Sequence, residues 1–75
     1  MKKPNIGDFV HIDRYHRKTH IDTTTGIMLK IHAVEPIHDP AENAFVIRLL
    51  ETQGAISEYL LNPLWDSVKV LCAAR

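Results

Sequence analysis

Five short segments of the chain are rich in β-branched, aromatic and other apolar residues. The clearest is 27–34, in which isoleucine and leucine at every second position alternate with lysine and histidine, the period of two that is typical of a β-strand. The segment 44–51 has a helical alternative, because leucine, arginine and glutamate are also compatible with helices. The predicted strands are residues 9–13, 27–34, 44–51, 55–61 and 68–71. The pattern therefore predicts an all-β protein.

Turn-forming residues separate these strands. The polar segment 14–25 predicts a long loop or an open hairpin that ends at Gly26, and 52–54 predicts a tight turn. Asn62 and Pro63 are typical of the cap and first position of a helix, so they indicate one helical turn before the last strand. The other expected irregular parts are a turn at 7–8, a loop over 35–43 and a tail at 72–75.

The order of these parts resembles the SH3-like small β-barrel over about residues 6–71. The residues that carry the resemblance are Gly7-Asp8-Phe9-Val10 and Leu61-Asn62-Pro63-Leu64-Trp65. The resemblance implies a five-stranded barrel with a one-turn helix before the last strand, and a shallow binding face flanked by the first loop and the helical turn. Trp65 is expected to pack as a plug at the end of this barrel. Small phage-encoded accessory proteins look similar, which implies a location in the host cytoplasm or the virion.

One enzyme of this size and shape is the type II dihydrofolate reductase, whose pore is lined by a Val-Gln-Ile-Tyr stretch. The corresponding residues here are Ser57-Glu58-Tyr59-Leu60, which lack the glutamine. His38-Asp39 would suit a base and its orienting group, but no serine or cysteine nucleophile stands beside them. We therefore expect a protein that is not an enzyme, with an enzyme subunit completed only by oligomerisation as the weakest reading.

Composition limits the other classes. A chain of 75 residues with 45% hydrophobic residues predicts one folded domain over 1–75. Nine basic and nine acidic residues cancel, so no global charge attracts nucleic acid or a membrane. The single cysteine, Cys72, excludes an internal disulfide and is expected to be inert. Because no apolar run suits a signal peptide or a membrane span, we expect an intracellular protein.

Five histidines raise the question of a metal site. His16 and His20 are four residues apart, but the adjacent arginine and lysine would repel a cation and the glutamate of a His-Glu-x-x-His motif is missing. We expect no metal and no cofactor. His11 and His32 would be cross-strand neighbours if their strands pair, which would make a pH-dependent surface.

The only basic cluster is the segment 14–20, in which charged, imidazole and aromatic side chains could contact phosphates and stack on a base. Asp13 and Asp22 bracket this cluster and weaken its field. An acidic protein partner would suit the same side chains. The candidate binding residues here are Arg14, Tyr15, His16, Arg17, Lys18 and His20.

The predicted strands also carry more apolar side chains than one core can bury. In the second, third and fourth strands both faces are largely apolar, so one set should lie under a loop or against another chain. Met28, Tyr59 and Leu61 are candidates for this binding surface. The first expectation is a non-catalytic binding module that docks on a protein partner or self-associates. The alternative is a nucleic-acid-binding barrel that uses the basic segment.

Overall fold

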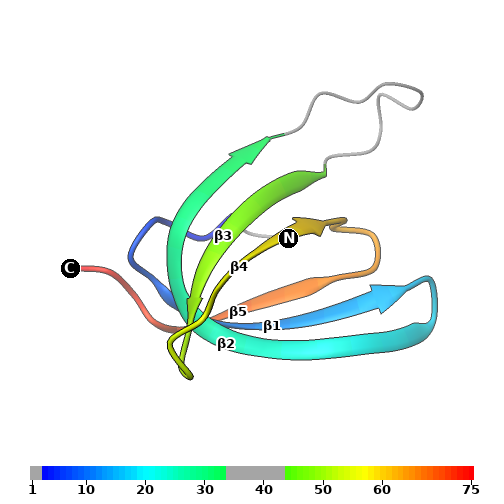
Figure 1. The fold of residues 1–75 in the computed structure, drawn as a ribbon. Coiled ribbons are helices and arrows are strands. Elements are labelled where there is room, and N and C mark those ends of the chain that lie inside the picture. The colour runs from blue at the N-terminus through cyan, green and yellow to red at the C-terminus, as the bar shows by residue number, and fades with distance from the viewer. Residues whose placement is uncertain (1–2, 34–43) are drawn as a thin grey trace.

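The computed structural model describes residues 3–33 and 44–75. These residues form a single antiparallel sheet in the spatial order β4–β3–β2–β1–β5 (Figure 1). The strands are β1 Phe9–His16, β2 Thr19–Ala33, β3 Phe45–Glu51, β4 Ile56–Leu61 and β5 Ser67–Cys72. The all-β prediction is confirmed, and the helical alternative for 44–51 is wrong. Hydrogen bonds do not close the sheet into a barrel in the described ranges, because β4 pairs only with β3 and β5 only with β1.

The largest difference from the predicted strands is the segment 14–25, for which a long loop or an open hairpin was expected and which forms an ordered hairpin that extends both strands. Strands β1 and β2 continue up to a two-residue turn, where His16 pairs with Thr19. Arg17 in this turn has a φ of 56°, in the left-handed region that favours glycine. The segment is polar because one face of the hairpin is exposed, and its threonines are good strand formers. The predicted end of the second strand at Val34, and the loop at 35–43 with His38, lie outside the described residues.

Strand β2 is long because it pairs with β1 along its first part and with β3 along its second part, and it bends between them (Figure 1). Gly26 lies where both neighbours meet. A Cβ atom at Gly26 would lie 2.2 Å from the carbonyl oxygen of Leu50, so only glycine fits there. Because the bend brings the two halves of one sheet face to face, a single sheet can enclose a core.

A β-bulge in β2 reverses the predicted alternation. Met28 pairs with Leu49 and Lys30 pairs with Arg48, so Leu29 is an extra residue on this strand. The bulge places Met28 and Ile31 on the same inner face, although their spacing is odd. Ile27 and Leu29, which the alternation grouped with Ile31, are instead exposed.

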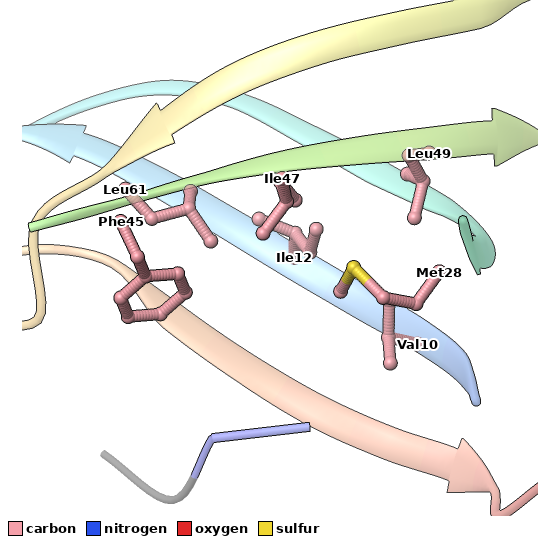
Figure 2. Packing of buried hydrophobic residues seen from close by; sticks show 7 residues of the cluster. All are labelled: Val10, Ile12, Met28, Phe45, Ile47, Leu49 and Leu61. Atoms are coloured by element: carbon pink, nitrogen blue, oxygen red, sulfur yellow. The ribbon is translucent and has the colours of Figure 1, made fainter. Parts of the chain in front are cut away.

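The core lies between the two halves of the bent sheet and is built from alternate residues of four strands. Figure 2 shows that side chains from β1 and β3 converge in the same space. Ile31, Tyr59 and Val68 pack against this cluster with part of their surface exposed. The buried hydrophobic residues are Val10, Ile12, Met28, Phe45, Ile47, Leu49 and Leu61.

The connection from β4 to β5 is a hydrogen-bonded turn, and no helix occurs in the described part of the chain. Asn62 caps the turn, since its Oδ1 accepts from the Leu64 amide at 2.9 Å. Its carbonyl accepts from the amides of Trp65 and Asp66 at 3.0 and 2.8 Å. The predicted cap at Asn62 is therefore correct, but these bonds close a single turn that is not continued into a helix, because the chain enters β5 at Ser67. Among the described residues, no helix could span a bilayer.

The two ends of the described chain are joined by a buried carboxylate. Asp8 is 3% exposed and follows Gly7, which has a φ of 93°. The Oδ1 atom of Asp8 accepts from the Ala74 amide at 2.7 Å, and Oδ2 accepts from the Asn5 amide at 2.9 Å. The predicted tail at 72–75 is thus partly ordered, with Cys72 in β5 and Ala74 held against the N-terminal turn.

Candidate binding surface

The basic segment predicted as a binding loop forms the tip of the β1–β2 hairpin. The side chains at its tip are exposed, whereas Tyr15 is half-buried and its ring lies 4.9 Å from the ring of His20 at an angle of 53°. Arg17 and Lys18 form no ion pair with the described residues, so their charges are available to a partner. The exposed members of the predicted cluster are His16, Arg17, Lys18 and His20.

Arg14 does not belong to this exposed group. Its Nη1 donates to Asp22 Oδ2 at 3.1 Å, and its guanidinium lies 4.7 Å from the centre of the Tyr59 ring. The Tyr59 hydroxyl donates to Glu51 Oε1 at 3.0 Å, and Ser57 Oγ donates to Glu51 Oε2 at 3.0 Å. Arg14 and Tyr59 therefore belong to a polar network at one end of the inner face, and the binding role predicted for them is not supported by this geometry.

Met28 and Leu61, which were also candidates for the binding surface, are fully buried. Met28 turns inward because it precedes the bulge in β2, and Leu61 pairs with Phe45 on the inner face. The sheet does expose surplus apolar side chains. On β2 and β4 these side chains lie on the face opposite to the one that carries Met28 and Leu61. On β4 these are Ile56 and Leu60, with exposed fractions of 63% and 59%.

Trp65 is 42% exposed, so the prediction that it plugs the end of a barrel is wrong. The turn that carries Trp65 is complete after one set of hydrogen bonds, and the core is already filled by residues of the strands. Leu64 beside it is 67% exposed. Two adjacent apolar residues in so short a turn cannot both point inward, and this signal could have identified them as surface residues.

The turn at 62–66 is fixed against the base of the basic hairpin. Asp66 is 9% exposed, and its Oδ1 accepts from the backbone amide of Tyr15 at 2.7 Å. Its Oδ2 accepts from the Asn62 amide at 2.8 Å, which ties the turn to itself. This one carboxylate therefore places the exposed Leu64 and Trp65 next to the strand that leads to the cationic tip. Sequence reasoning did not identify Asp66 in this role.

A second polar cluster lies on the outer face of the same hairpin, around Asp13. The Thr23 hydroxyl donates to Asp13 Oδ1 at 2.6 Å. His20 Nε2 lies 3.3 Å from Asp13 Oδ1, and His11 Nε2 lies 3.5 Å from Asp13 Oδ2. His11 pairs with Thr25, so the expected pairing of His11 with His32 is wrong; the short turn sets a different register.

The Thr23 hydrogen bond, with smaller contributions from His11 and His20, lowers the pKa of Asp13 below its ordinary value of 3.8. A lowered pKa in the folded state stabilises the fold above pH of about 3.8, and this stabilisation disappears as the pH falls through the folded-state value. We therefore expect the difference in unfolding free energy between the wild type and Asp13→Asn to shrink as the pH falls from 5 toward 2. Urea unfolding followed by circular dichroism over this range measures it; a difference that grows toward low pH would contradict the assignment.

A separate apolar strip crosses the outer face of the sheet at the opposite end of β1 from the hairpin tip. Phe9 pairs with Ile27, Ile27 with Leu50, and Leu50 with Ile56, so one apolar residue from each of four strands lies in a row. An open hollow of about 290 Å³ lies along this row, lined in part by Phe9, Ile27 and Leu50. The row and the hairpin tip are roughly 20 Å apart along β1, so they are two different surfaces.

In the described ranges, no group of three or more histidine, cysteine, aspartate or glutamate side chains could hold a metal ion. No known family model matches the chain, and no curated protein or solved structure is significantly similar to it. The conclusions on function therefore depend on the geometry of the side chains.

Proposed function

We propose that this protein is a non-catalytic binding module that docks on a protein partner at the end formed by the β1–β2 hairpin and the 62–66 turn. The observation that carries the proposal is the contact of Asp66 with the Tyr15 amide at 2.7 Å. It holds an exposed apolar pair, Leu64 and Trp65, beside exposed cations. Tryptophan is among the residues that contribute most to binding at protein interfaces, and charges at the rim steer association.

The partner surface that fits this end carries an apolar anchor flanked by carboxylates. Arg17 and Lys18 supply the positive charge, because the nearby Asp22 is occupied by Arg14 and Asp13 is surrounded by two histidines. With a net charge of zero, the protein has no long-range attraction for nucleic acid, which favours a protein partner.

The strand order supports the SH3-like resemblance at the level of topology. Four strands follow one another in space, and the last strand returns beside the first after a short turn. In the SH3-like fold, the first loop and the segment before the last strand flank a shallow binding face. The hairpin and the turn at 62–66 correspond to these two parts. A role as a phage accessory protein, in the host cytoplasm or the virion, remains part of the proposal.

A selection of random displayed peptides against the purified protein tests this function. We expect enriched peptides to contain an aromatic or aliphatic residue next to aspartate or glutamate, and Trp65→Ala to weaken their binding about tenfold or more, which is 1.4 kcal/mol. Because the ring is 42% exposed, the same substitution should cost less than about 1 kcal/mol of stability in urea unfolding.

Ile27→Ala is the matched control, since Ile27 is exposed to a similar degree, 41%, but lies in the distant apolar strip. It should leave peptide binding unchanged. The double variant Arg17→Glu/Lys18→Glu should slow association with acidic peptides. Micromolar binding of generic duplex or single-stranded DNA at low salt, abolished in this double variant, would instead support the nucleic-acid alternative and overturn the protein-docking proposal.

A further inference from the structure

Strand β4 leaves one backbone edge of the sheet open. It stands at one end of the sheet order, so within the described residues it pairs only with β3. The backbone hydrogen bonds that turns and terminal segments form in these ranges do not reach Ile56, Glu58 or Leu60. The strand contains no proline, and its pairing with β3 shows no bulge. Soluble proteins commonly protect an edge with such features, so this edge can accept a further strand.

The register of the β3–β4 hairpin shows which residues of β4 direct their backbone groups to the open edge. The Glu51 amide donates to the Ala55 carbonyl at 2.8 Å, so this pair is hydrogen-bonded. Bonded and non-bonded pairs alternate along an antiparallel ladder, so odd-numbered residues of β4 direct their amides and carbonyls toward β3. Even-numbered residues direct theirs to the open edge. These residues are Ile56, Glu58 and Leu60.

The same three residues expose their side chains on the outer face of the sheet. Ile56 and Leu60 have exposed fractions of 63% and 59%, and the Glu58 side chain between them is 51% exposed. The edge therefore offers unpaired backbone groups together with a negative charge that lies between two apolar side chains.

The other end strand, β5, is less open. Its pairing with β1 changes register between Phe9 and Val10, and such an irregularity disturbs an edge. The N-terminal segment 3–5 borders the same hollow as Val68 and Val70 of β5, and Pro4 in this segment is buried. Strand β4 is therefore the more accessible of the two edges.

Strand β3 shows which side chains fit beside the outer face of β4. Arg48 pairs with Glu58 there, and its Nη2 lies 3.6 Å from Glu58 Oε1. Two residues to either side of Arg48, the apolar Val46 and Leu50 pair with the apolar residues of β4. A cation between two apolar residues, at alternate positions of an extended strand, is therefore the pattern that complements β4.

We propose that the open edge of β4 binds an extended segment of a partner protein, in which a lysine or arginine stands between two apolar residues at alternate positions. The segment runs antiparallel to β4, with its cation opposite Glu58 and its apolar residues opposite Ile56 and Leu60. Backbone hydrogen bonds supply affinity, and the three cross-strand pairs supply specificity. This site differs from the docking end, which is formed by the β1–β2 hairpin and the 62–66 turn.

The β4 strand of a second copy does not have the complementary pattern. In the antiparallel register that places Ile56 opposite the second copy's Leu60, Glu58 comes opposite the second copy's Glu58. Like charges directly opposite each other destabilise a strand pair. Strand β3, which has the complementary pattern, is already paired on both sides within its own sheet. The charges therefore favour a different protein over self-association.

A synthetic peptide with the sequence of residues 45–51 is the probe, because it carries the three complementary side chains of β3. The changes Ile47→Thr and Leu49→Thr in this peptide make its other face polar while retaining residues that favour strands.

Amide hydrogen exchange of the protein, measured by NMR, detects the contact. Without peptide, the amides of the odd-numbered residues of β4 should be protected by β3, whereas those of Ile56, Glu58 and Leu60 should exchange rapidly. Saturating peptide should slow the exchange of these three amides about tenfold or more.

Charge exchange tests the register. Arg48→Glu in the peptide should weaken its binding to the wild-type protein about threefold or more, because like charges then stand opposite each other. Glu58→Lys in the protein should restore the binding of this altered peptide. Its urea midpoint should stay close to the wild-type value, since Glu58 is exposed. Lys69→Glu on β5 is the matched control and should leave peptide binding unchanged.

Methylation of single peptide nitrogens gives a second measurement on the wild-type protein. N-methylation of the residue opposite Glu58 should abolish binding, whereas N-methylation at position 47 should not, because that amide points away from β4. Equal loss from both methylations would contradict the proposed ladder. No slowing of exchange at Ile56, Glu58 and Leu60 with millimolar peptide, or slowing on β5 instead, would overturn the proposal.

Discussion

Replacing Gly26 with alanine is expected to destabilise the protein by about 3 kcal/mol, at the upper end of the cost of overpacking. A Cβ at this position would lie 2.2 Å from the carbonyl oxygen of Leu50, 2.8 Å from its carbonyl carbon and 2.9 Å from Glu51 Cα. These atoms belong to the backbone of β3, so no rotation of a side chain can relieve the clash. The only relief is to separate β2 from β3 at the bend, which would open the core.

Gly54→Ala is the control for this prediction. Gly54 has a φ of 94°, and a Cβ there would meet nothing within 4 Å. Alanine at Gly54 therefore tests backbone strain alone, with an expected cost of about 1–2 kcal/mol. Urea unfolding followed by circular dichroism compares the two variants. If Gly26→Ala were no less stable than Gly54→Ala, the close approach at the bend would not be what requires glycine.

The strand segments were predictable where side chains are buried. The segments 44–51 and 55–61 match β3 and β4 to within one residue at each end, because apolar residues at alternate positions there fill the core. For 14–25 the sequence left a long loop and an open hairpin as alternatives, since the two-residue turn of the observed hairpin contains no glycine. Arg17 takes up the left-handed conformation in its place, and the composition of the segment does not show this.

The bulge at Leu29 could not be predicted from the pattern. Ile27, Leu29 and Ile31 alternate regularly in the sequence, and that regularity suggests one buried face. The extra residue in β2 is needed to keep both Met28 and Ile31 in contact with the core, and this requirement depends on the pairing with β3. The alternation of residues within β2 carries no information on how β2 is aligned with β3, so it cannot predict the bulge.

Only the exposure of the candidate binding residues can be compared with the sequence. His16, Arg17, Lys18 and His20 are exposed at the hairpin tip, but the inward turn of Arg14 toward Asp22 and Tyr59 depends on contacts between strands that are far apart in the chain. The role of Asp66 is similarly non-local, since it bonds to an amide 51 residues away. Trp65 is exposed because the contact between Asp66 and the Tyr15 amide fixes the turn that carries it, and because residues of the strands already fill the core.

Asp66→Ala should cost about 3 kcal/mol of stability, because hydrogen bonds to a charged acceptor contribute about 1.5–3 kcal/mol each and both of its oxygens are used. Asp66 is 9% exposed and accepts from the amides of Tyr15 and Asn62 at 2.7 and 2.8 Å. Alanine would leave both donors without these partners. Asp66→Asn retains one carbonyl oxygen as an acceptor, so it should lose about half as much stability.

The two substitutions also separate folding from binding. At a temperature where both variants remain folded by circular dichroism, Asp66→Ala should weaken the binding of the selected acidic peptides as strongly as Trp65→Ala does. The reason is that the turn which carries Leu64 and Trp65 would no longer be held against β1. If Asp66→Ala bound these peptides with wild-type affinity while losing the expected stability, the carboxylate would be important only for the fold, and the docking surface would have to lie elsewhere on the sheet.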